Sequence, residues 1–468
     1  MRDLSMIAAA LAERKPGHSL PQLLYNSPEA YEFDLEAIFG QSWILAGFAC
    51  EIPRPRGYLA LTIGRSPVVI TRDRDGAFRA FFNSCRHRGA QVCPDGPGGK
   101  ARLTCPYHQW VYGLDGRLVH AQNMQPSFRP DEHGLKPIHV EEVAGALFVS
   151  LAETPPAFDR FRADLEPLLA PHRLNEAKLA HQNTLVEKGN WKLVMENARE
   201  CYHCAVGHPE LALTFPIAEA KGGQFAKEGD PRHAAFDARL AAAGLAKGPF
   251  LGPWWQVERF PLKEGQVSLT MDGRPAVTKL MIAGDDPDVG SLRWAIEPHS
   301  FCHSTADTTV YFSAMPTATG ETVVTCKWLV HQDAVEGVDY DVERLTALWN
   351  ITNQQDRDLV ELNQRGVNSL GYTPGPYCED GEDYVIRFVD WYCDKAEKFI
   401  AARTGSDTGI GTSIDWRPTA MDVLPAAIGT AVSPAPGLAA VPSEIGLALA
   451  FAADVSTAAG AEQRPDAS

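Results

Sequence analysis

Two short motifs that each pair a cysteine with a histidine constrain this chain more than any other feature. His87 follows Cys85 after one intervening residue, and His108 follows Cys105 after two. Two thiolates and two imidazoles can hold one metal centre, which requires a fold that brings both segments together. A Cys₂His₂ zinc finger uses the same groups but keeps its cysteines apart from its histidines. Pairs that mix the two residue types favour an iron–sulfur cluster in which one iron binds two cysteines and the other binds two histidines.

The sequence around these motifs is typical of short antiparallel strands. Residues 67–73 are rich in β-branched side chains, and Asp75-Gly76 is a hairpin signal before the apolar residues 78–84. We therefore expect an all-β domain over residues 41–152, in which each Cys/His pair lies at the tip of a hairpin.

The pattern after residue 152 indicates a second domain, over residues 153–404. Helices are expected at 156–180 and 190–204, and a long helix from about Asp339 to Arg365 is expected to end with Gly366 as its cap. The segments expected to form strands are 266–271, 277–283, 291–297, 308–315 and 321–331. Several strands followed by one long helix are typical of an α+β domain.

The ends of the chain and its charge limit the classes of protein to consider. Residues 1–40 are expected to pack on the second domain, and residues 405–468, rich in Ala, Pro, Gly and Ser, are predicted to be a mostly disordered tail. The formal net charge of −16 argues against nucleic acid as a partner. No apolar stretch has the length of a secretory core or a membrane span, so we expect a cytoplasmic protein with reduced cysteines.

The second domain carries two histidines five residues apart, His203 and His208. Side chains three or four residues apart share a face of a helix, so these imidazoles converge only if the helix unwinds, which Gly207 and Pro209 favour. Two imidazoles and one carboxylate form the facial triad of non-haem Fe(II) oxygenases. The nearby pair Cys201 and Cys204 has no second CxxC and is expected to be a packing feature.

The third ligand is sought on the long helix, which carries Asp356, Asp358 and Glu361. At ~100° per residue, Asp356 falls in the middle of the apolar stripe, whereas Asp358 and Glu361 point away from it. A carboxylate on an apolar face is costly unless it is paired or binds a metal. Asp356 is the predicted ligand, and Asp358 is the reserve.

The segments CRHRG (85–89) and CPYHQW (105–110) resemble the Rieske signature of ring-hydroxylating oxygenases, with Gln109 where that family usually has Gly. The resemblance covers roughly residues 25–400. It implies a Rieske [2Fe–2S] cluster, a mononuclear Fe(II), a helix-grip catalytic domain, a homotrimer, and a separate NAD(P)H-dependent flavin and iron–sulfur reductase. It also implies that Glu200 bridges the two histidine sets between subunits, although many ring hydroxylases have Asp there, and that Asn197 lies in the pocket or beside the iron ligands.

Two further segments, 197–211 and 364–377, resemble the oxygenases that demethylate quaternary ammonium compounds such as glycine betaine and stachydrine. The implied reaction uses O₂ to hydroxylate an N-methyl group and releases formaldehyde and the demethylated amine. A cation of this kind favours aromatic faces, and Trp254 and Trp255 are the best candidates, because the adjacent Gly252 and Pro253 indicate a loop. The alternatives are an aromatic ring-hydroxylating dioxygenase and, outside enzymes, a Rieske electron carrier.

Overall fold

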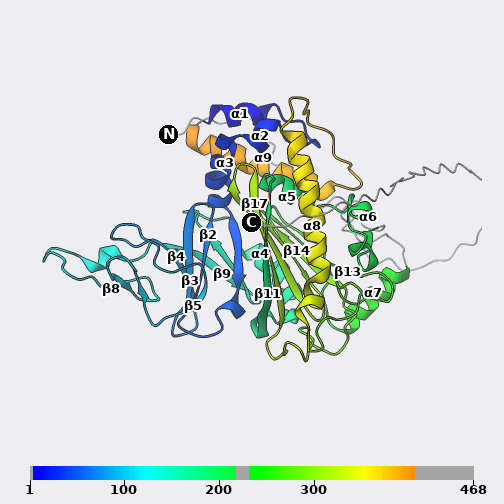
Figure 1. The fold of residues 1–468 in the computed structure, drawn as a ribbon, viewed down its shortest axis with the longest axis horizontal. Coiled ribbons are helices and arrows are strands. Elements are labelled where there is room, and N and C mark those ends of the chain that lie inside the picture. The colour runs from blue at the N-terminus through cyan, green and yellow to red at the C-terminus, as the bar shows by residue number, and fades with distance from the viewer. Residues whose placement is uncertain (1–3, 218–230, 406–468) are drawn as a thin grey trace, which may run out of the picture. The chain divides into compact units, whose positions relative to one another are not determined.

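The first part of the fold is antiparallel β structure that surrounds the cysteine and histidine motifs (Figure 1). The computed structural model describes residues 4–217 and 231–405, which belong to a compact unit that spans Met1–Trp416. One sheet has the strand order β1-β10-β9-β4-β3-β2-β5, and a small sheet has the order β6-β7-β8. The strands are β1 (Trp43–Phe48), β2 (Gly57–Ile63), β3 (Ser66–Arg72), β4 (Phe78–Phe82), β5 (Gly96–Gly99), β6 (Leu103–Thr104), β7 (Val111–Tyr112), β8 (Leu118–His120), β9 (Pro137–Val143) and β10 (Ala146–Ser150).

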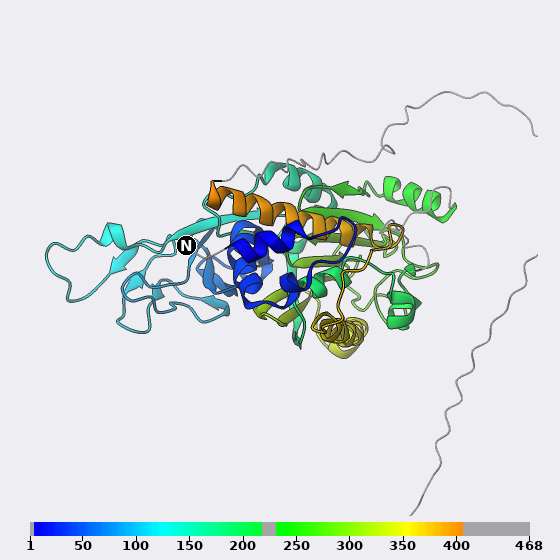
Figure 2. The same ribbon diagram turned by 90° about the horizontal axis from the view of Figure 1, so that it is seen from above.

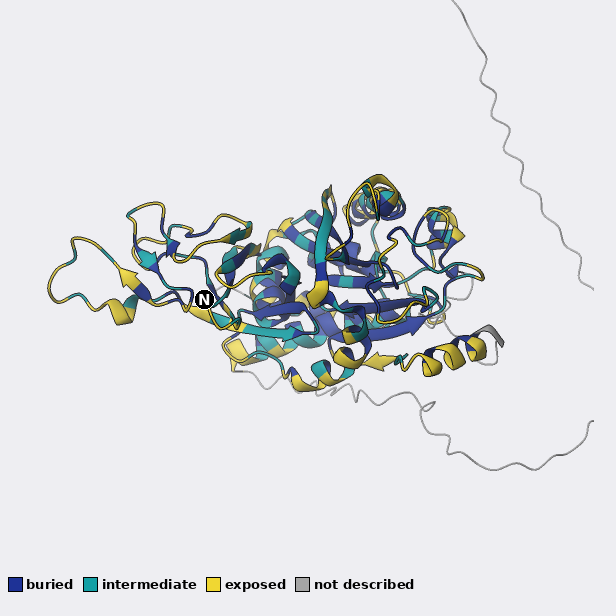
Figure 3. Cartoon of the chain, turned by 90° about the horizontal axis from the view of Figure 1, so that it is seen from below, coloured by how far each residue is buried: buried dark blue, intermediate teal, exposed yellow. Residues whose placement is uncertain are grey.

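A second antiparallel sheet follows, with the order β11-β17-β16-β15-β14-β13-β12. Its strands are β11 (Ala177–Glu187), β12 (Phe250–Leu251), β13 (Trp255–Phe260), β14 (Ser291–Ile296), β15 (Ser300–Ser304), β16 (Thr309–Ala318) and β17 (Glu321–His331). Figure 3 shows that these strands are largely buried. The predicted α+β class and the strands near 291–297, 308–315 and 321–331 are confirmed.

The strands predicted at 266–271 and 277–283 are wrong, because both segments are loops. The buried side chain of Asp307 takes the place of a strand ladder there. It accepts hydrogen bonds from the Ser268 hydroxyl at 2.8 Å and from the Ala276 backbone N–H at 2.7 Å. A carboxylate that satisfies loop donors in this way lets an apolar segment be buried without strand pairing.

The helices are α1 (Ser5–Ala12), α2 (Gln22–Asn26), α3 (Pro28–Phe33), α4 (Asp159–Leu169), α5 (Trp191–Asn197), α6 (Cys204–Gly207), α7 (Pro231–Ala242), α8 (Val342–Val367) and α9 (Asp383–Thr404). The helix predicted at 156–180 is shorter, because β11 begins at Ala177. Gly366 lies inside α8, whose cap is Asn368, so the prediction of Gly366 as the cap is wrong. Within residues 4–217 and 231–405, no helix has the length and hydropathy needed to cross a membrane.

The long helix α8 lies against α5 and β11 and is seen nearly end-on in Figure 2. Gly189 permits this close approach, because a Cβ atom there would lie 2.4 Å from Cγ1 of Val360. The Asn190 backbone N–H donates to Oε1 of Gln364 at 2.7 Å, and the Asn190 side chain caps α5. These contacts fix α5 and α8 relative to each other, which positions the side chains that both helices direct toward the site.

The N-terminal segment packs on the second sheet and its helices. Asp34, which is buried, pairs with Lys192 of α5 and accepts hydrogen bonds from Trp191 Nε1 at 2.8 Å and from the Tyr392 hydroxyl at 2.9 Å. A buried ion pair is tolerated only when its remaining hydrogen-bonding capacity is satisfied, as it is here. The predicted tail, residues 405–468, lies outside the described residues apart from Gly405, which caps α9.

Candidate functional site

Two loops with the same hydrogen-bonding pattern carry the first set of predicted ligands. In one loop the Cys85 N–H donates to Ala90 O at 2.8 Å, and the Gly89 N–H donates to Cys85 O at 2.9 Å. In the other loop the Cys105 N–H donates to Trp110 O at 2.8 Å, and the N–H of Gln109 donates back to Cys105 O at 3.2 Å.

This repetition explains the residue at which the sequence departs from the expected motif. Gly89 and Gln109 occupy equivalent positions and both have a positive φ, of 82° and 56° respectively. A left-handed backbone costs an L-residue roughly 1–2 kcal/mol, and glycine avoids that cost. Gln109 therefore adopts the conformation that a glycine would take, and the second loop keeps its shape.

The four predicted ligands lie together at these loops. The Cys85 and Cys105 side chains are buried, and burial, first of all, raises the pKa of the Cys85 thiol. The rings of His87 and His108 have centroids 4.6 Å apart, and His87 is exposed. Two buried sulfurs beside two more accessible imidazoles are the donor set of a Rieske cluster.

Two neighbouring aromatic residues support these ligands, and the sequence did not single them out for that role. The Tyr112 hydroxyl lies 3.2 Å from Sγ of Cys85 and accepts a hydrogen bond from the Arg86 N–H at 2.9 Å. The indole ring of Trp110 stacks on His87 at a centroid distance of 4.9 Å. Hydrogen bonds to the sulfurs tune the reduction potential of such clusters.

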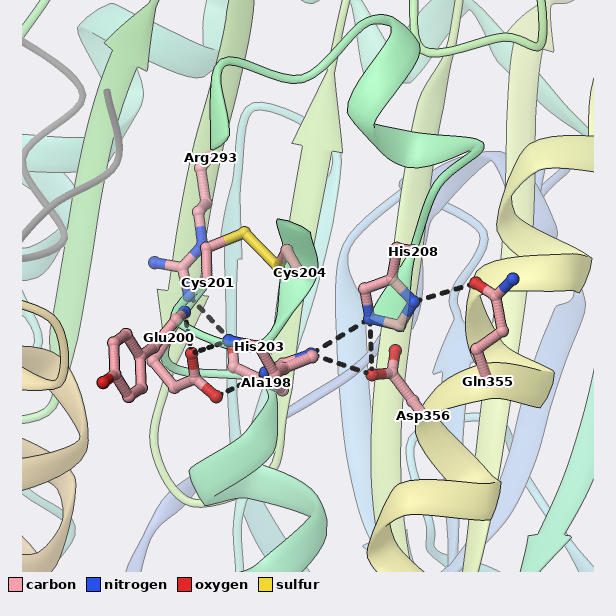
Figure 4. Close-up of a disulfide and its surroundings, with 10 residues drawn as sticks. Ala198, Glu200, Cys201, His203, Cys204, His208, Arg293, Gln355 and Asp356 are labelled. Atoms are coloured by element: carbon pink, nitrogen blue, oxygen red, sulfur yellow. Dashed lines mark hydrogen bonds and ion pairs between the residues drawn. A yellow bond between two sulfur atoms is a disulfide. The ribbon is translucent and has the colours of Figure 1, made fainter. Parts of the chain in front are cut away.

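A second group of ligands converges between α6 and α8 (Figure 4). Nε2 of His203 lies 3.0 Å from Nε2 of His208. Oδ1 of Asp356 lies 3.3 Å from the former atom and 2.9 Å from the latter. The helix predicted at 190–204 ends early, at Asn197, and the two histidines flank the short helix α6. This break in the helix, rather than an unwinding after His203, aims both imidazoles at one point.

The surroundings of these three residues are suited to a divalent cation. Burial disfavours the charged form of His203, but hydrogen bonds to Asp356 and Glu200 outweigh it and raise the pKa of His203 to about 9. A metal ion competes with protons for the same nitrogen and oxygen atoms. Asp358, the reserve, is exposed and pairs with Arg357, so the structure directs Asp356 and not Asp358 toward the histidines.

Further side chains hold the two imidazoles in position from behind. Glu200 accepts a hydrogen bond from Nδ1 of His203, so that carboxylate contacts the predicted ligand. Nδ1 of His208 lies 2.9 Å from Oε1 of Gln355, whose amide nitrogen donates to Glu210 at 2.8 Å. Such partners fix the tautomer and the orientation of a histidine that binds metal. The hydrogen bonds that link His208 to Glu210 through Gln355 were not predicted, because Gln355 is 147 residues from His208 and 145 residues from Glu210 in sequence.

A cavity opens beside the three converging residues. Its lining includes Asn197 and Glu200, with two arginines, Arg199 and Arg293. The aromatic side chains in the lining are Phe215, Phe301, His303, Trp349 and Tyr384. The ring of His303 stacks on Trp349 at a centroid distance of 5.3 Å.

Trp254 and Trp255, which were predicted to face a substrate, do not line this cavity. Both are buried, and their rings pack against Phe161 of α4 at centroid distances of 4.6 Å and 5.4 Å. Nε1 of Trp255 donates to Asp164 at 3.0 Å, which satisfies its only polar group. The pair belongs to the hydrophobic core.

Cys201 and Cys204 form a disulfide across the loop that carries His203 (Figure 4). The expectation of reduced cysteines that serve only in packing is therefore wrong for this pair. Cys204 lies close to both histidines, but a sulfur in a disulfide has no thiolate to offer a metal. The candidate metal centre thus keeps two imidazoles and one carboxylate.

Comparisons with known proteins agree with this division into two sites. The model of the Rieske [2Fe-2S] domain family matches residues 42–141. The model of the ring hydroxylating alpha subunit (catalytic domain) matches residues 174–398. The first range contains both cysteine and histidine motifs, and the second contains the converging histidines and Asp356.

Individual relatives match along most of the chain. The glycine betaine monooxygenase oxygenase subunit of Chromohalobacter salexigens is 45% identical over 397 residues, which cover 83% of this chain and 88% of the relative. The corresponding subunit of Pseudomonas aeruginosa is 46% identical over 398 residues, which cover 83% and 91%. A solved structure of a quaternary ammonium Rieske monooxygenase has a TM-score of 0.64 at 23% identity, covering 82% of this chain and 97% of that one.

Proposed function

This chain belongs to the Rieske non-haem iron oxygenases of the ring-hydroxylating alpha subunit family, and from that premise we propose that it demethylates a small quaternary ammonium compound. One atom of O₂ enters a C–H bond of an N-methyl group, and the other leaves as water with two electrons and two protons. The C–N bond of the hydroxymethyl group then breaks, its hydroxyl group loses a proton, and formaldehyde and a tertiary amine are released. Glycine betaine is the first substrate to test, because the relatives that match along most of the chain are glycine betaine monooxygenase subunits.

The residues present fit both iron groups of the family. Cys85, His87, Cys105 and His108 would hold the Rieske cluster, and His203, His208 and Asp356 would hold the mononuclear iron. Oδ1 of Asp356 lies 3.3 Å from Nε2 of His203 and 2.9 Å from Nε2 of His208, so these three atoms are close enough to bind one cation. When bound, the mononuclear iron supplies O₂ activation, and the cluster supplies an electron.

The chain's own residues position the substrate and the ligands. Glu200 and Gln355 orient the two imidazoles from their Nδ1 sides, which leaves both Nε2 atoms directed at one point. Asn197 lies at the end of α5, where the cavity begins. The aromatic rings of Phe215, Phe301 and Trp349 line the cavity, and aromatic side chains of this kind would favour a cation.

The observation that carries this proposal is the convergence of two imidazoles and one carboxylate at the edge of a cavity with aromatic walls. A Rieske electron carrier needs only its cluster and does not require a second metal site. An aromatic ring-hydroxylating dioxygenase would use the same ligands, but the relatives at 45–46% identity act on a quaternary ammonium compound by name.

Two features of the proposed enzyme, a homotrimer and a separate NAD(P)H-dependent reductase, rest on the family resemblance. A third feature, a cytoplasmic location, rests on the sequence, in which no apolar stretch has the length of a secretory core. In the trimer Glu200 would bridge the histidine ligands of one subunit to those of its neighbour. The exposure of His87 at the loop tip supports this arrangement, because an electron leaves the cluster most easily through an accessible ligand.

The test is the release of formaldehyde by the iron-loaded protein with a reductase and NADH. The substrates are glycine betaine, stachydrine, carnitine, choline and a few aromatic acids. We expect formaldehyde from one of the quaternary ammonium compounds. Oxidation of an aromatic acid without formaldehyde from any amine would instead assign the chain to the dioxygenases.

A further inference from the structure

Arg293 is a buried arginine with an unused hydrogen-bond donor in the wall of the cavity. It lies on β14, and its neighbours Leu292 and Trp294 are buried in the core. Only 6% of Arg293 is exposed, and it is one of the residues that line the cavity. Its Nη2 donates to Ala198 O at 3.1 Å, whereas Nη1 is buried and has no partner among the described residues.

The second arginine of the cavity differs from Arg293 in how its charge is balanced. Arg199 forms a two-pronged ion pair with Glu297, from Nε at 3.0 Å and from Nη2 at 2.7 Å. In the described part of the chain no carboxylate forms such an ion pair with Arg293. Glu258 is its register partner on β13, but the Glu258 carboxylate receives its recorded hydrogen bond from Gln256, at 3.3 Å.

A buried guanidinium with an unused N–H donor is costly, so it points to an anionic partner outside the described residues. A carboxylate suits this position, because charge-assisted hydrogen bonds between arginine and carboxylate are strong in a site that excludes water. In Figure 4, Arg293 and Asp356 lie on opposite sides of His203. A molecule in the cavity can therefore have its anionic end near Arg293 and its other end near the metal ligands.

We propose that Nη1 of Arg293 binds the carboxylate of the substrate and thereby selects quaternary ammonium compounds that carry a carboxylate. This inference rests on the proposed function and narrows its substrate class. The carboxylate end of the zwitterion lies at Arg293, and the methyl groups are directed toward His203, His208 and Asp356. Choline, a quaternary ammonium cation without a carboxylate, leaves the Arg293 guanidinium without an anionic partner, so it binds more weakly.

The experiment measures binding rather than turnover. Isothermal titration of the anaerobic, iron-loaded protein gives the Kd for glycine betaine and for choline in the wild type, Arg293→Gln and Arg293→Lys. A hydrogen bond to a charged group is worth about 10- to 100-fold in affinity, so we expect Arg293→Gln to lose that much for glycine betaine and little for choline. Arg293→Lys keeps the charge, and we expect it to restore part of the affinity.

A matched control removes one positive charge elsewhere in the same domain. Arg344 pairs with Asp272 at the surface and is 40% exposed. We expect Arg344→Gln to leave both Kd values unchanged. The absorption of the cluster and the melting temperature show whether each variant is folded. If Arg293→Gln fails to fold, the comparison of Arg293→Lys with the wild type decides.

Acetate, a carboxylate without an ammonium group, separates this inference from the proposed function. We expect acetate to compete with glycine betaine in the wild type and to bind at least about 10-fold more weakly to Arg293→Gln. Equal acetate binding by both proteins, or equal losses for glycine betaine and choline, overturns the carboxylate contact. Acetate binding that depends on Arg293, in a protein that demethylates no quaternary ammonium compound, supports the contact and refutes the proposed function.

Discussion

The two candidate metal sites are built in opposite ways. The cluster ligands lie at the tips of two loops, and His87 is exposed while His108 is half-buried. The mononuclear site lies between α6 and α8, where the His208 side chain is 2% exposed and a cavity adjoins the ligands. A group that exchanges electrons benefits from exposure, whereas a group that oxidises a C–H bond needs a cavity that excludes water. The difference in exposure therefore matches the division of labour in the proposed reaction.

The sharpest test of this division is to remove the mononuclear iron and the cluster separately, each in a variant that keeps the other group. For Asp356→Ala we expect iron content to fall from about three to about two per chain, because the cluster holds two. The loss of a residue that only supports a metal ligand typically lowers activity by about 10- to 100-fold. Demethylation by Asp356→Ala should fall further, because Asp356 is itself a proposed ligand. Iron analysis and the cluster spectrum check both points. Asp358→Asn, two residues away and exposed, is the control and should resemble the wild type.

The reciprocal change is His108→Ala, which removes a ligand from the loop tip. We expect the visible absorption of the cluster to be lost or strongly altered, with no demethylation, while a mononuclear Fe(II) still binds in the second domain. EPR of the nitric oxide adduct of that Fe(II) provides the measurement. Loss of both irons in this variant would show that the two sites do not form independently.

A smaller change tests the carboxylate that contacts the mononuclear site from the side of α5. For Glu200→Gln we expect both iron groups to remain and turnover to fall by about 10- to 100-fold, because the charge beside His203 is lost. Steady-state demethylation and the cluster spectrum check this result. Normal turnover by this variant would contradict the proposed bridging role of Glu200.

The smallest effect is expected from a substitution of Gln355, which contacts Nδ1 of His208. Gln355→Leu removes the partner of Nδ1 while the imidazole itself remains. We expect the affinity of the second domain for iron to fall by about 10-fold, which is the lower end of the effect of removing such a partner, and we expect the cluster to be unaffected. Competition with a chelator measures the change. An unchanged affinity would mean that packing alone orients the His208 ring.

Local sequence patterns were sufficient for the parts of the fold and of the site that depend on neighbouring residues. The Cys/His spacing placed four candidate ligands on two loops that do come together. Asp356 could be chosen over Asp358 because the helical period separates their faces by ~200°. The strands near 291–297 and 321–331 were predictable from their apolar residues, because the sheet to which they belong is buried.

Features that depend on distant contacts were not predictable. The segments 266–271 and 277–283 were predicted as strands because nothing local reveals that Asp307 accepts hydrogen bonds from the Ser268 hydroxyl and from the Val277 N–H. Trp254 and Trp255 looked available because composition does not tell which face of β13 meets α4. Arg293 sits on an apolar strand, and its unpaired Nη1 is visible only once the cavity is known.

The most direct test of the whole account is the stoichiometry of the coupled reaction. Purified protein, reductase, NADH, O₂ and glycine betaine are combined, and formaldehyde, NADH and O₂ are measured together with hydrogen peroxide. Two cooperating iron sites predict that formaldehyde appears in an amount equal to the NADH and the O₂ consumed. Consumption of NADH and O₂ with peroxide in place of formaldehyde, for every quaternary ammonium compound tested, would contradict the account.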